Sequence, residues 1–286
     1  MQAGNMRNKG HKIPKFRDTL RLIAVLLLFP MIFCVMSAAF AGADKITVYF
    51  YSCEANINNF KSLKMEFDSY LSKHGPYAFQ PFSDRDAFEK HIKGKEDCLL
   101  LLSSWHYRNI HKPYSLKSAL VGVRNGKKCQ KRLLVARGKT ATIESVKTGH
   151  VASASSTQHT TSILRTMLKE KYVPGTFRVL TVPKDIDALM SVGFGMSKSA
   201  LTTTSSLEEL SILNPVLQKK MKILVEGEES LLLILAVPER ITEQSEKLVT
   251  IMKDMPKDPD GKRKIRMLGL DGWQTLDPSE RSELEG

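Results

Sequence analysis

The sequence predicts an α/β protein built from mostly parallel sheets flanked by helices. Short apolar runs rich in β-branched residues alternate with amphipathic stretches, which is the pattern of sheets covered by helices. The 286 residues contain no internal repeat and no long linker, and 42% hydrophobic against 26% charged residues is typical of globular chains. This composition excludes a mostly disordered, fibrous or multi-spanning membrane protein. We expect two sheet-and-helix lobes joined by strands.

The first 41 residues are predicted to direct export. Residues 1–21 carry six basic residues and one acidic residue, a local net charge of +5, and residues 22–41 contain no charged residue. A basic lead, an apolar run and small residues before Ala41 are typical of a secretory signal peptide cleaved after that residue. An uncleaved anchor stays open, because 20 uncharged residues are long enough to span a bilayer. Bulky Phe33 before Cys34 disfavours a lipoprotein.

The net charge of +13 therefore divides into two parts. Five units belong to the leader, which leaves +8 on the 245 residues that follow it. A positive exported domain favours an anionic solute and weakens the case for nucleic acid as a partner. The basic run at 127–132 has no interleaved aromatic residues, so we interpret it as a solvated turn.

The cysteines predict neither a metal site nor a disulfide scaffold. Beyond the leader the chain has Cys53, Cys98 and Cys129, an odd number for an oxidising compartment, and at most one pair among them forms a disulfide. A Cys98–Cys129 bridge stays open. No CxxC pair and no His/Cys cluster with zinc spacing is present, so we expect no metal and no cofactor.

The elements that begin lobe one follow in order. Phe60, Leu63 and Phe67 have helical spacing, and Asp84 is a candidate N-cap. We expect a strand over 45–52, a helix over 59–75, a strand over 77–83, a helix over 84–93 and a buried strand over 98–104. Right-handed crossovers then place the loops after residues 52 and 104 at the carboxyl edge of one sheet, where ligands bind in open α/β sheets.

A second block of the same kind follows, and the chain then returns to the first. The predicted strands of this block are 132–138, 150–155, 176–182 and 197–204, and its predicted helical segments are 142–149, 156–173 and 184–193. After a polar segment, we expect strands over 221–227 and 231–238, a helix over 241–255 and an ordered end over 261–276. Residues 277–286 are expected to fray.

The segment HVASASSTQHTTSIL (150–164) carries the main candidate site. A strand ends at Ser155 and a helix begins near Ser156 and Thr157, so hydroxyls and helix-end amides leave the same loop. Together with the helix dipole these groups bind an anion without any Lys or Arg. The alternative is that Ser155 or Ser156 serves only as an N-cap.

These segments resemble the phosphate/phosphonate-type periplasmic substrate-binding proteins of ABC transporters over residues 45–276. The opening KITVYFYSCEANINNFKSLKMEFDSYLSKHG, the stretch GKEDCLLLLSSWHY, and LLVARGKTATIESVKTGHVASASSTQHTTSIL each resemble a unit of that family in the same order. MKILVEGEESLLLILAVPERIT and the closing GLDGW resemble its return strand and terminal element.

The resemblance implies a type II periplasmic-binding-protein fold, in which two hinge strands join two α/β lobes that close on a ligand. Lobe one would comprise 44–132 plus 238–276 and lobe two 133–237, with strand crossings near Leu133–Val135 and Leu233–Val237.

The resemblance also assigns candidate binding residues. Ser156 and Thr157 match the Ser-Thr of the family's phosphonate loop, whereas Gln158 and His159 replace its second Ser and its Gly. Ser155, Ser156 and Thr157 form the expected anion-binding loop.

Other positions matched to the family's cleft are less regular. Trp105 and Tyr107 fall in its aromatic loop, and Ser197 lies where the family places a segment whose Asp faces the ligand. That carboxylate is missing here, which makes an aminoalkylphosphonate doubtful. Glu54, in the first-lobe loop, would repel an anion. His106 is expected in a surface loop.

The leading functional hypothesis is an exported solute-binding protein. It would capture a small anionic solute and present it to an ABC permease of the inner membrane, as a monomer, without a cofactor and without nucleic acid. The alternative is a ligand-sensing or scaffolding module of the same fold. We do not expect an enzyme, because nothing in the sequence places a base beside Cys53.

Overall fold

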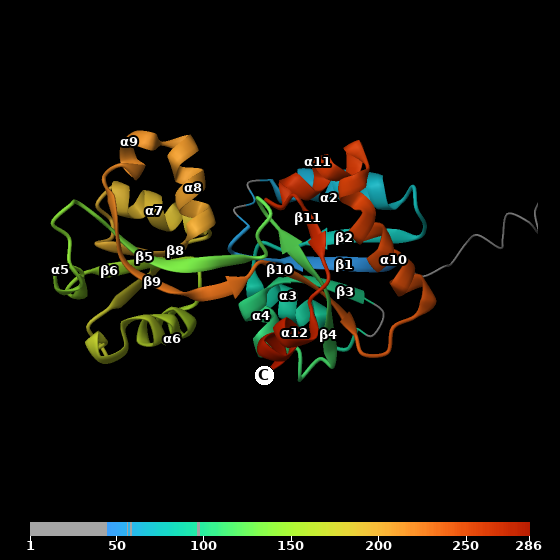
Figure 1. Ribbon diagram of the computed structural model, residues 1–286, viewed down its shortest axis with the longest axis horizontal. Helices are drawn as coiled ribbons and strands as arrows, with labels where there is room; N and C mark the ends of the chain where they lie inside the picture. The colour runs from blue at the N-terminus through green and yellow to red at the C-terminus, as the bar shows by residue number, and fades with distance from the viewer. Residues whose placement is uncertain (1–44, 56, 58, 96–97) are drawn as a thin grey trace, which may run out of the picture. The chain divides into compact units, whose positions relative to one another are not determined.

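The computed structural model describes residues 45–55, 57, 59–95 and 98–286 of the chain (Figure 1). The predicted signal peptide or anchor lies outside these residues. Within the described ranges, no helix combines the length and apolar character needed to cross a bilayer.

The first sheet has six strands in the order β11-β4-β10-β3-β1-β2. Strand β1 pairs in parallel with β2 and β3, whereas the contacts of β10 with β3 and β4, and of β11 with β4, are antiparallel. The strands are β1 (Ile46–Tyr51), β2 (Tyr77–Pro81), β3 (Cys98–Ser103), β4 (Leu116–Val123), β10 (Leu233–Pro238) and β11 (Gly272–Gln274).

The second sheet has five strands in the order β7-β6-β8-β5-β9. They are β5 (Cys129–Arg137), β6 (His150–Ser153), β7 (Arg178–Thr181), β8 (Ser199–Thr203) and β9 (Met221–Leu231). Strand β6 is parallel to β7 and β8, while β5 is antiparallel to β8 and β9. The α/β class is confirmed, and both sheets are mixed, because β10 and β11 run against the other strands of the first sheet and β5 runs against those of the second.

Each sheet is covered by helices on both faces, as Figure 1 shows. Alternation along the strands divides the core: Val48 and Phe50 pack on one face of the first sheet, and Tyr49 on the other. The helices are α2 (Phe60–Leu71), α10 (Glu243–Asp254) and α11 (Pro259–Met267) on one face, and α3 (Arg85–Ile92), α4 (Ser104–Ile110) and α12 (Pro278–Glu285) on the other.

The second sheet is packed in the same way. Leu133 and Val135 of β5 face one core cluster and Leu134 faces the other. The helices are α7 (Asp185–Gly193), α8 (Thr204–Leu213) and α9 (Pro215–Gln218) on the first side, and α5 (Ile143–Lys147) and α6 (Thr157–Leu168) on the second. Two short 3₁₀ turns, Lys169–Lys171 and Met255–Lys257, follow α6 and α10.

The chain passes between the sheets twice, once in the turn from β4 to β5 and once at Leu232 between β9 and β10. We call the first sheet with its helices lobe one (residues 45–128 and 232–286) and the second lobe two (residues 129–231). Both expected boundaries are shifted: Leu133–Val135 lies within β5 of the second sheet, so residues 129–132 belong to lobe two, and residues 233–237 belong to lobe one. Strand β10 lies inside the first sheet, between β3 and β4.

The C-terminal segment also differs from expectation. Residues 277–286 were expected to fray, but residues 278–285 form α12, which starts with a capping box between Asp277 and Glu280 and buries Leu284. The hydroxyl of Tyr107 and the amide of Ser118 both donate to the Glu285 carboxylate. The helix is therefore part of lobe one.

Candidate functional site

A cleft of about 550 Å³ lies where strands of both sheets end at their carboxyl edges. Lobe one contributes the ends of β1 and β3 and the first turns of α3 and α4; lobe two contributes the loop before α6 and the residues after β7. The lining residues are Tyr51, Cys53, Ser83, Asp84, Arg85, Asp86, Ser103, Trp105, His106, Ala154, Ser155, Ser156, Thr181, Val182 and Pro183. Three residues predicted from the sequence, Ser155, Ser156 and Trp105, are thus brought together.

The loop between β6 and α6 is held by its own hydroxyls. The Ser155 amide and the Thr160 hydroxyl both donate to Ser153 Oγ, over 3.2 and 2.9 Å. Ser156 is the N-cap of α6, and its Oγ accepts from the His159 amide over 3.3 Å. A capping hydroxyl still has its hydrogen to donate, and the amides at the first turn of a helix have no partner within the helix. The loop therefore both caps the helix and presents donors.

Thr157 is the first residue of α6 and is exposed. It does not line the cleft. Its place in the anion site stays a prediction.

Trp105 connects the two lobes. Its ring stacks on the ring of His159 from α6, with 28° between the planes, and the Arg85 guanidinium lies 5.0 Å from the Trp105 ring centroid. Burial, with the charges of Arg132 and Arg85, lowers the pKa of His159 to about 3. The imidazole is therefore neutral near pH 7 and adds no charge to the cleft.

A cluster of charged residues lies beside the cleft. Arg132 on β5 forms ion pairs with Glu54 of lobe one and with Asp185 of lobe two, the latter at 3.5 Å between Nη1 and Oδ2. The Gln130 amide donates to Glu54 Oε2 over 2.6 Å. Arg132 is buried, so its assignment to a solvated turn is wrong, and the Glu54 charge expected to repel an anion is compensated.

Burial shifts the titration of the groups around this cluster. It raises the pKa of Asp185 to about 7 although Arg132 opposes it, and burial with the Asp185 and Glu54 charges raises the pKa of the Cys53 thiol to about 12. Burial alone would lower the pKa of Arg132, but the two carboxylates raise it. A protonated Cys53 thiol lacks the thiolate that a nucleophile needs.

Two predicted cleft residues lie elsewhere. The Tyr107 ring is fully buried in lobe one, and its hydroxyl donates to Glu285 over 2.7 Å. Ser197 precedes β8, at the edge of the sheet away from the cleft, and its hydroxyl accepts from Ser191. Both predictions are wrong, because helical direction turns Tyr107 inward and the 194–198 loop enters β8 from its amino end.

His106 was expected in a surface loop, yet its side chain is buried against Glu89. The hydrogen bond from His106, with that from Arg85, lowers the pKa of Glu89 to about 2. Arg85 was missed, although it directly follows the predicted N-cap Asp84 at the carboxyl edge of a strand. This position at the carboxyl edge could have indicated that Arg85 lines the cleft.

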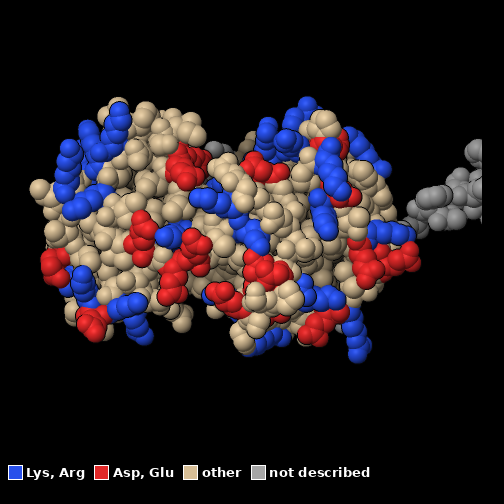
Figure 2. All heavy atoms as spheres, in the orientation of Figure 1, with Lys and Arg blue, Asp and Glu red and all other residues tan. Residues whose placement is uncertain are grey.

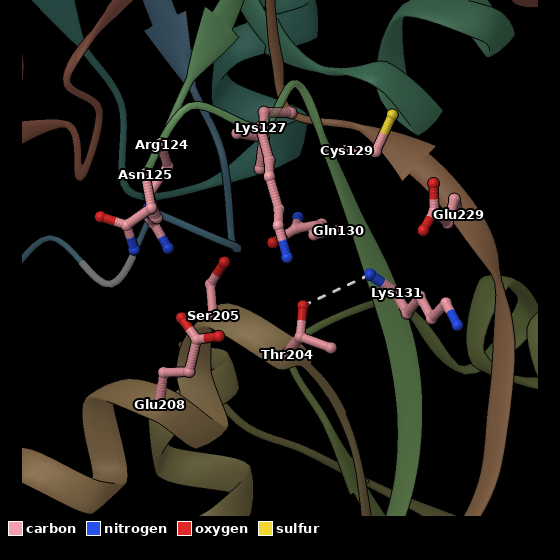
Figure 3. Close-up of a pocket in the computed structure, with 11 residues that line it drawn as sticks. Arg124, Asn125, Lys127, Cys129, Gln130, Lys131, Thr204, Ser205, Glu208 and Glu229 are labelled. Atoms are coloured by element: carbon pink, nitrogen blue, oxygen red, sulfur yellow. Dashed lines mark hydrogen bonds between the residues drawn. The ribbon is translucent and has the colours of Figure 1, made fainter.

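A second hollow of about 320 Å³ lies between the β4–β5 turn and the first turn of α8 (Figure 3). Its lining mixes the cations Arg124, Lys127 and Lys131 with Glu208 and Glu229. The Thr204 hydroxyl oxygen accepts from the Lys131 amide over 3.4 Å. Among the described residues, no cluster of His, Cys, Asp and Glu could hold a metal ion.

Several solved structures share this fold. A binding protein component of an ABC phosphonate transporter from Pseudomonas aeruginosa is similar at a TM-score of 0.69, with 15% identity over 85% of this chain and 86% of that one. PhnD1 from Prochlorococcus marinus, in complex with methylphosphonate, is similar at 0.65, with 13% identity over 85% and 96%. The aliphatic sulphonate binding protein SsuA from Escherichia coli is similar at 0.54, with 8% identity over 85% and 90%.

The fold is therefore that of the type II periplasmic binding proteins. A family model described as "ABC transporter, phosphonate, periplasmic substrate-binding protein" matches residues 62–280. The chain belongs to this family, whose members are periplasmic substrate-binding proteins of ABC transporters. No curated protein is significantly similar to the sequence.

Proposed function

We propose that the chain binds a small anionic solute, a phosphate- or phosphonate-like oxyanion, in the cleft and presents it to an ABC permease. The observation that carries this proposal is the opening of the α6 N-terminus onto the cleft, with Ser155 and Ser156 opposite Trp105. The volume of about 550 Å³ is within the range of roughly 300–1,000 Å³ usual for small-molecule sites.

The helix N-termini at the cleft support an anion. The positive ends of α3 and α6 lie at its wall, and each helix contributes first-turn amides. Arg85 lines the cleft together with the carboxylates Asp84 and Asp86, and it also pairs with Glu89 at 2.7 Å. Recognition would then depend mainly on neutral N–H and O–H donors, which suits a solute whose charge is spread over several oxygens.

The similar proteins point to the same chemistry. The Prochlorococcus marinus protein holds methylphosphonate, and the others are named for phosphonate transport and for aliphatic sulphonates. Phosphonates and sulphonates share a tetrahedral head with three oxygens. We therefore expect the solute of this chain to carry such a head, and we expect the chain to act as an exported monomer after cleavage of residues 1–41.

Calorimetry and thermal shift against phosphate, phosphite, sulfate, methylphosphonate and an alkyl sulphonate test the proposal. We expect one or more of these oxyanions to raise the melting temperature in a concentration-dependent manner, because a ligand that binds only the folded state stabilises it. If none of them binds, the anion assignment fails.

Substitution of Ser156 tests the site itself. Ser156→Ala removes the hydroxyl that faces the cleft, and we expect roughly a tenfold loss of affinity, the effect of one hydrogen bond to a charged group. The substitution also costs about 1 kcal/mol as a lost N-cap. Thr142→Ala is the matched control, because Thr142 caps α5 in the same lobe and does not line the cleft. Equal affinity of both variants would contradict the proposed site.

A further inference from the structure

Lobe two carries a group of exposed apolar side chains that its fold does not use. Phe194, Met196, Ile212, Leu213 and Val216 are between 63% and 81% exposed. Large apolar side chains scattered singly on a surface are ordinary, but a group of five marks an interaction surface. We call these five residues the apolar tip.

The five residues belong to one corner of the lobe. Phe194 and Met196 follow the end of α7, while the other three lie at the end of α8 and in α9. Gly193 packs directly against the side chain of Leu217 in α9, so the two segments are neighbours.

The apolar tip lies at the sheet edge opposite the cleft. The cleft residues follow the carboxyl ends of β6 and β7, whereas the 194–198 loop precedes the amino end of β8. At that same edge Ala136 pairs with Ser199, and Arg137 with Met221. A partner at the apolar tip would therefore leave the cleft free.

Basic residues flank the apolar tip, while the acidic residues Glu208 and Glu209 lie one helical turn before Ile212 and Leu213 in α8. The segments 136–141, 193–198 and 211–222 contain six Lys and Arg residues and no Asp or Glu. Arg137 is tied to this corner, since its guanidinium donates to the Gly193 carbonyl over 2.9 Å, and the Gly138 amide donates to the Lys220 carbonyl. Figure 2 shows Lys and Arg side chains beside uncharged surface at the end of lobe two where α9 lies in Figure 1.

We propose that the apolar tip docks lobe two on the surface of a bilayer that contains anionic lipid. Exposed Phe, Ile and Leu side chains enter the boundary between headgroups and acyl chains, and flanking Lys and Arg residues attract anionic headgroups. A second copy of the chain fits poorly, because two such corners would bring their cations face to face. This inference is independent of the solute in the cleft.

Fluorescence of the labelled full chain mixed with lipid vesicles tests whether the apolar tip binds to a bilayer surface. An environment-sensitive fluorescent amino acid replaces Leu213 in one protein and Met65, an equally exposed apolar residue of α2 in lobe one, in the other. With phosphatidylglycerol in the vesicles, brominated acyl chains should quench the label at position 213 and leave the label at position 65 bright. Quenching should fall at high salt or with phosphatidylcholine alone.

Charge variants complete the test. Lys219→Gln with Lys220→Gln should weaken binding to these vesicles, followed by the quenching at position 213, roughly 30-fold, because each cation near an anionic surface contributes about 1 kcal/mol. Lys253→Gln with Lys262→Gln, two exposed positions of lobe one, should leave it unchanged. The proposal is overturned if position 213 stays unquenched or is quenched no more than position 65. A blue shift that grows with protein concentration but shows no quenching would assign the apolar tip to a second copy instead.

Discussion

Asp185 is a fully buried carboxyl group in the first turn of α7, beside the cleft. Among the described residues, its ion-pair partner is Arg132, with 3.5 Å between Oδ2 and Nη1. Such a group is costly to ionise, which is why burial raises its pKa to about 7. Near neutral pH, Asp185 thus exchanges a proton within the charged cluster that connects the lobes.

The raised pKa predicts a pH dependence of stability. An unfolded aspartate has a pKa of 3.8, so between pH 4 and 7 the folded chain binds more protons than the unfolded chain. The free energy of unfolding therefore falls as pH rises through this range. Asp185→Asn should remove that contribution. The free energy of unfolding of the variant, relative to that of the wild type, should therefore be higher at pH 8 than at pH 4 by on the order of 1–3 kcal/mol. Urea unfolding of both proteins across the range measures the difference.

The difference between variant and wild type isolates Asp185 from His159, which acts in the opposite sense. The pKa of His159 is lowered to about 3 from 6.5, so its contribution is lost as pH falls below 6.5. A gain for Asp185→Asn that is the same at every pH would contradict the prediction.

For single residues, the sequence predicts hydrogen-bond donors of the cleft better than it predicts which side chains contact one another. Ser155 and Ser156 were predicted because they follow a strand at a carboxyl edge, a property of the local sequence, and Trp105 because it matches the aromatic loop of the family that the sequence resembles. Arg132 was misread because burial of an arginine depends on Glu54, which lies 78 positions away. No local pattern contains such a pairing.

Among the elements, α12 shows how a polar C-terminal segment becomes structural. The Glu285 carboxylate accepts from the hydroxyls of Tyr107 and Ser118 at 2.7 and 2.9 Å, and Lys128 pairs with Glu280. Burial, with the hydrogen bond to Glu285, raises the pKa of Tyr107 well above its usual value. These contacts fix the helix on α4.

Tyr107→Phe should lower the free energy of unfolding by about 1–2 kcal/mol, because Glu285 loses a donor at a partly buried site. Solute affinity should not change, since Tyr107 does not line the cleft. Chemical denaturation and calorimetry measure the two effects, with Tyr114→Phe as the control. A loss of solute affinity in Tyr107→Phe would contradict this prediction and show that Tyr107 contributes to solute binding.

Strands that are continuous apolar runs, such as β3 and β10, are evident from the sequence because both of their faces are buried. Strand β4 was missed, since the run around Leu116 to Val123 includes Lys117, Ser118 and Gly122. The local sequence pattern also could not predict the direction of the strands. Whether β5 and β10 run parallel or antiparallel to their neighbours depends on which sheet each strand joins.

For the whole molecule, two contacts between the lobes define the observed arrangement of the cleft. Glu54 of lobe one pairs with Arg132 of lobe two, and Trp105 of lobe one stacks on His159 of lobe two. Arg132 also reaches Asp185, so one guanidinium compensates two carboxylates. Breaking a buried ion pair by removal of one partner leaves an uncompensated charge.

Arg132→Leu should therefore destabilise the chain by about 3–5 kcal/mol. Lys131→Leu is the matched control, because its half-exposed ion pair with Glu226 at 3.2 Å is worth at most about 1 kcal/mol. The double variant Arg132→Leu with Glu54→Leu should recover part of the loss. Equal destabilisation by the two single variants, measured by urea unfolding, would show that the cluster does not hold the lobes.

The connectivity of lobe two has a consequence for its evolution. Its elements come from one uninterrupted segment, and the ends of that segment, Cys129 and Leu231, are paired residues on neighbouring strands. Lobe one is assembled from the chain on both sides of this insertion. Because this segment begins and ends on neighbouring strands, it could be exchanged as a unit. A replacement would have to match only two neighbouring strand ends. Recombination at these two points would transfer the complete loop between β6 and α6 from one relative to another in one event.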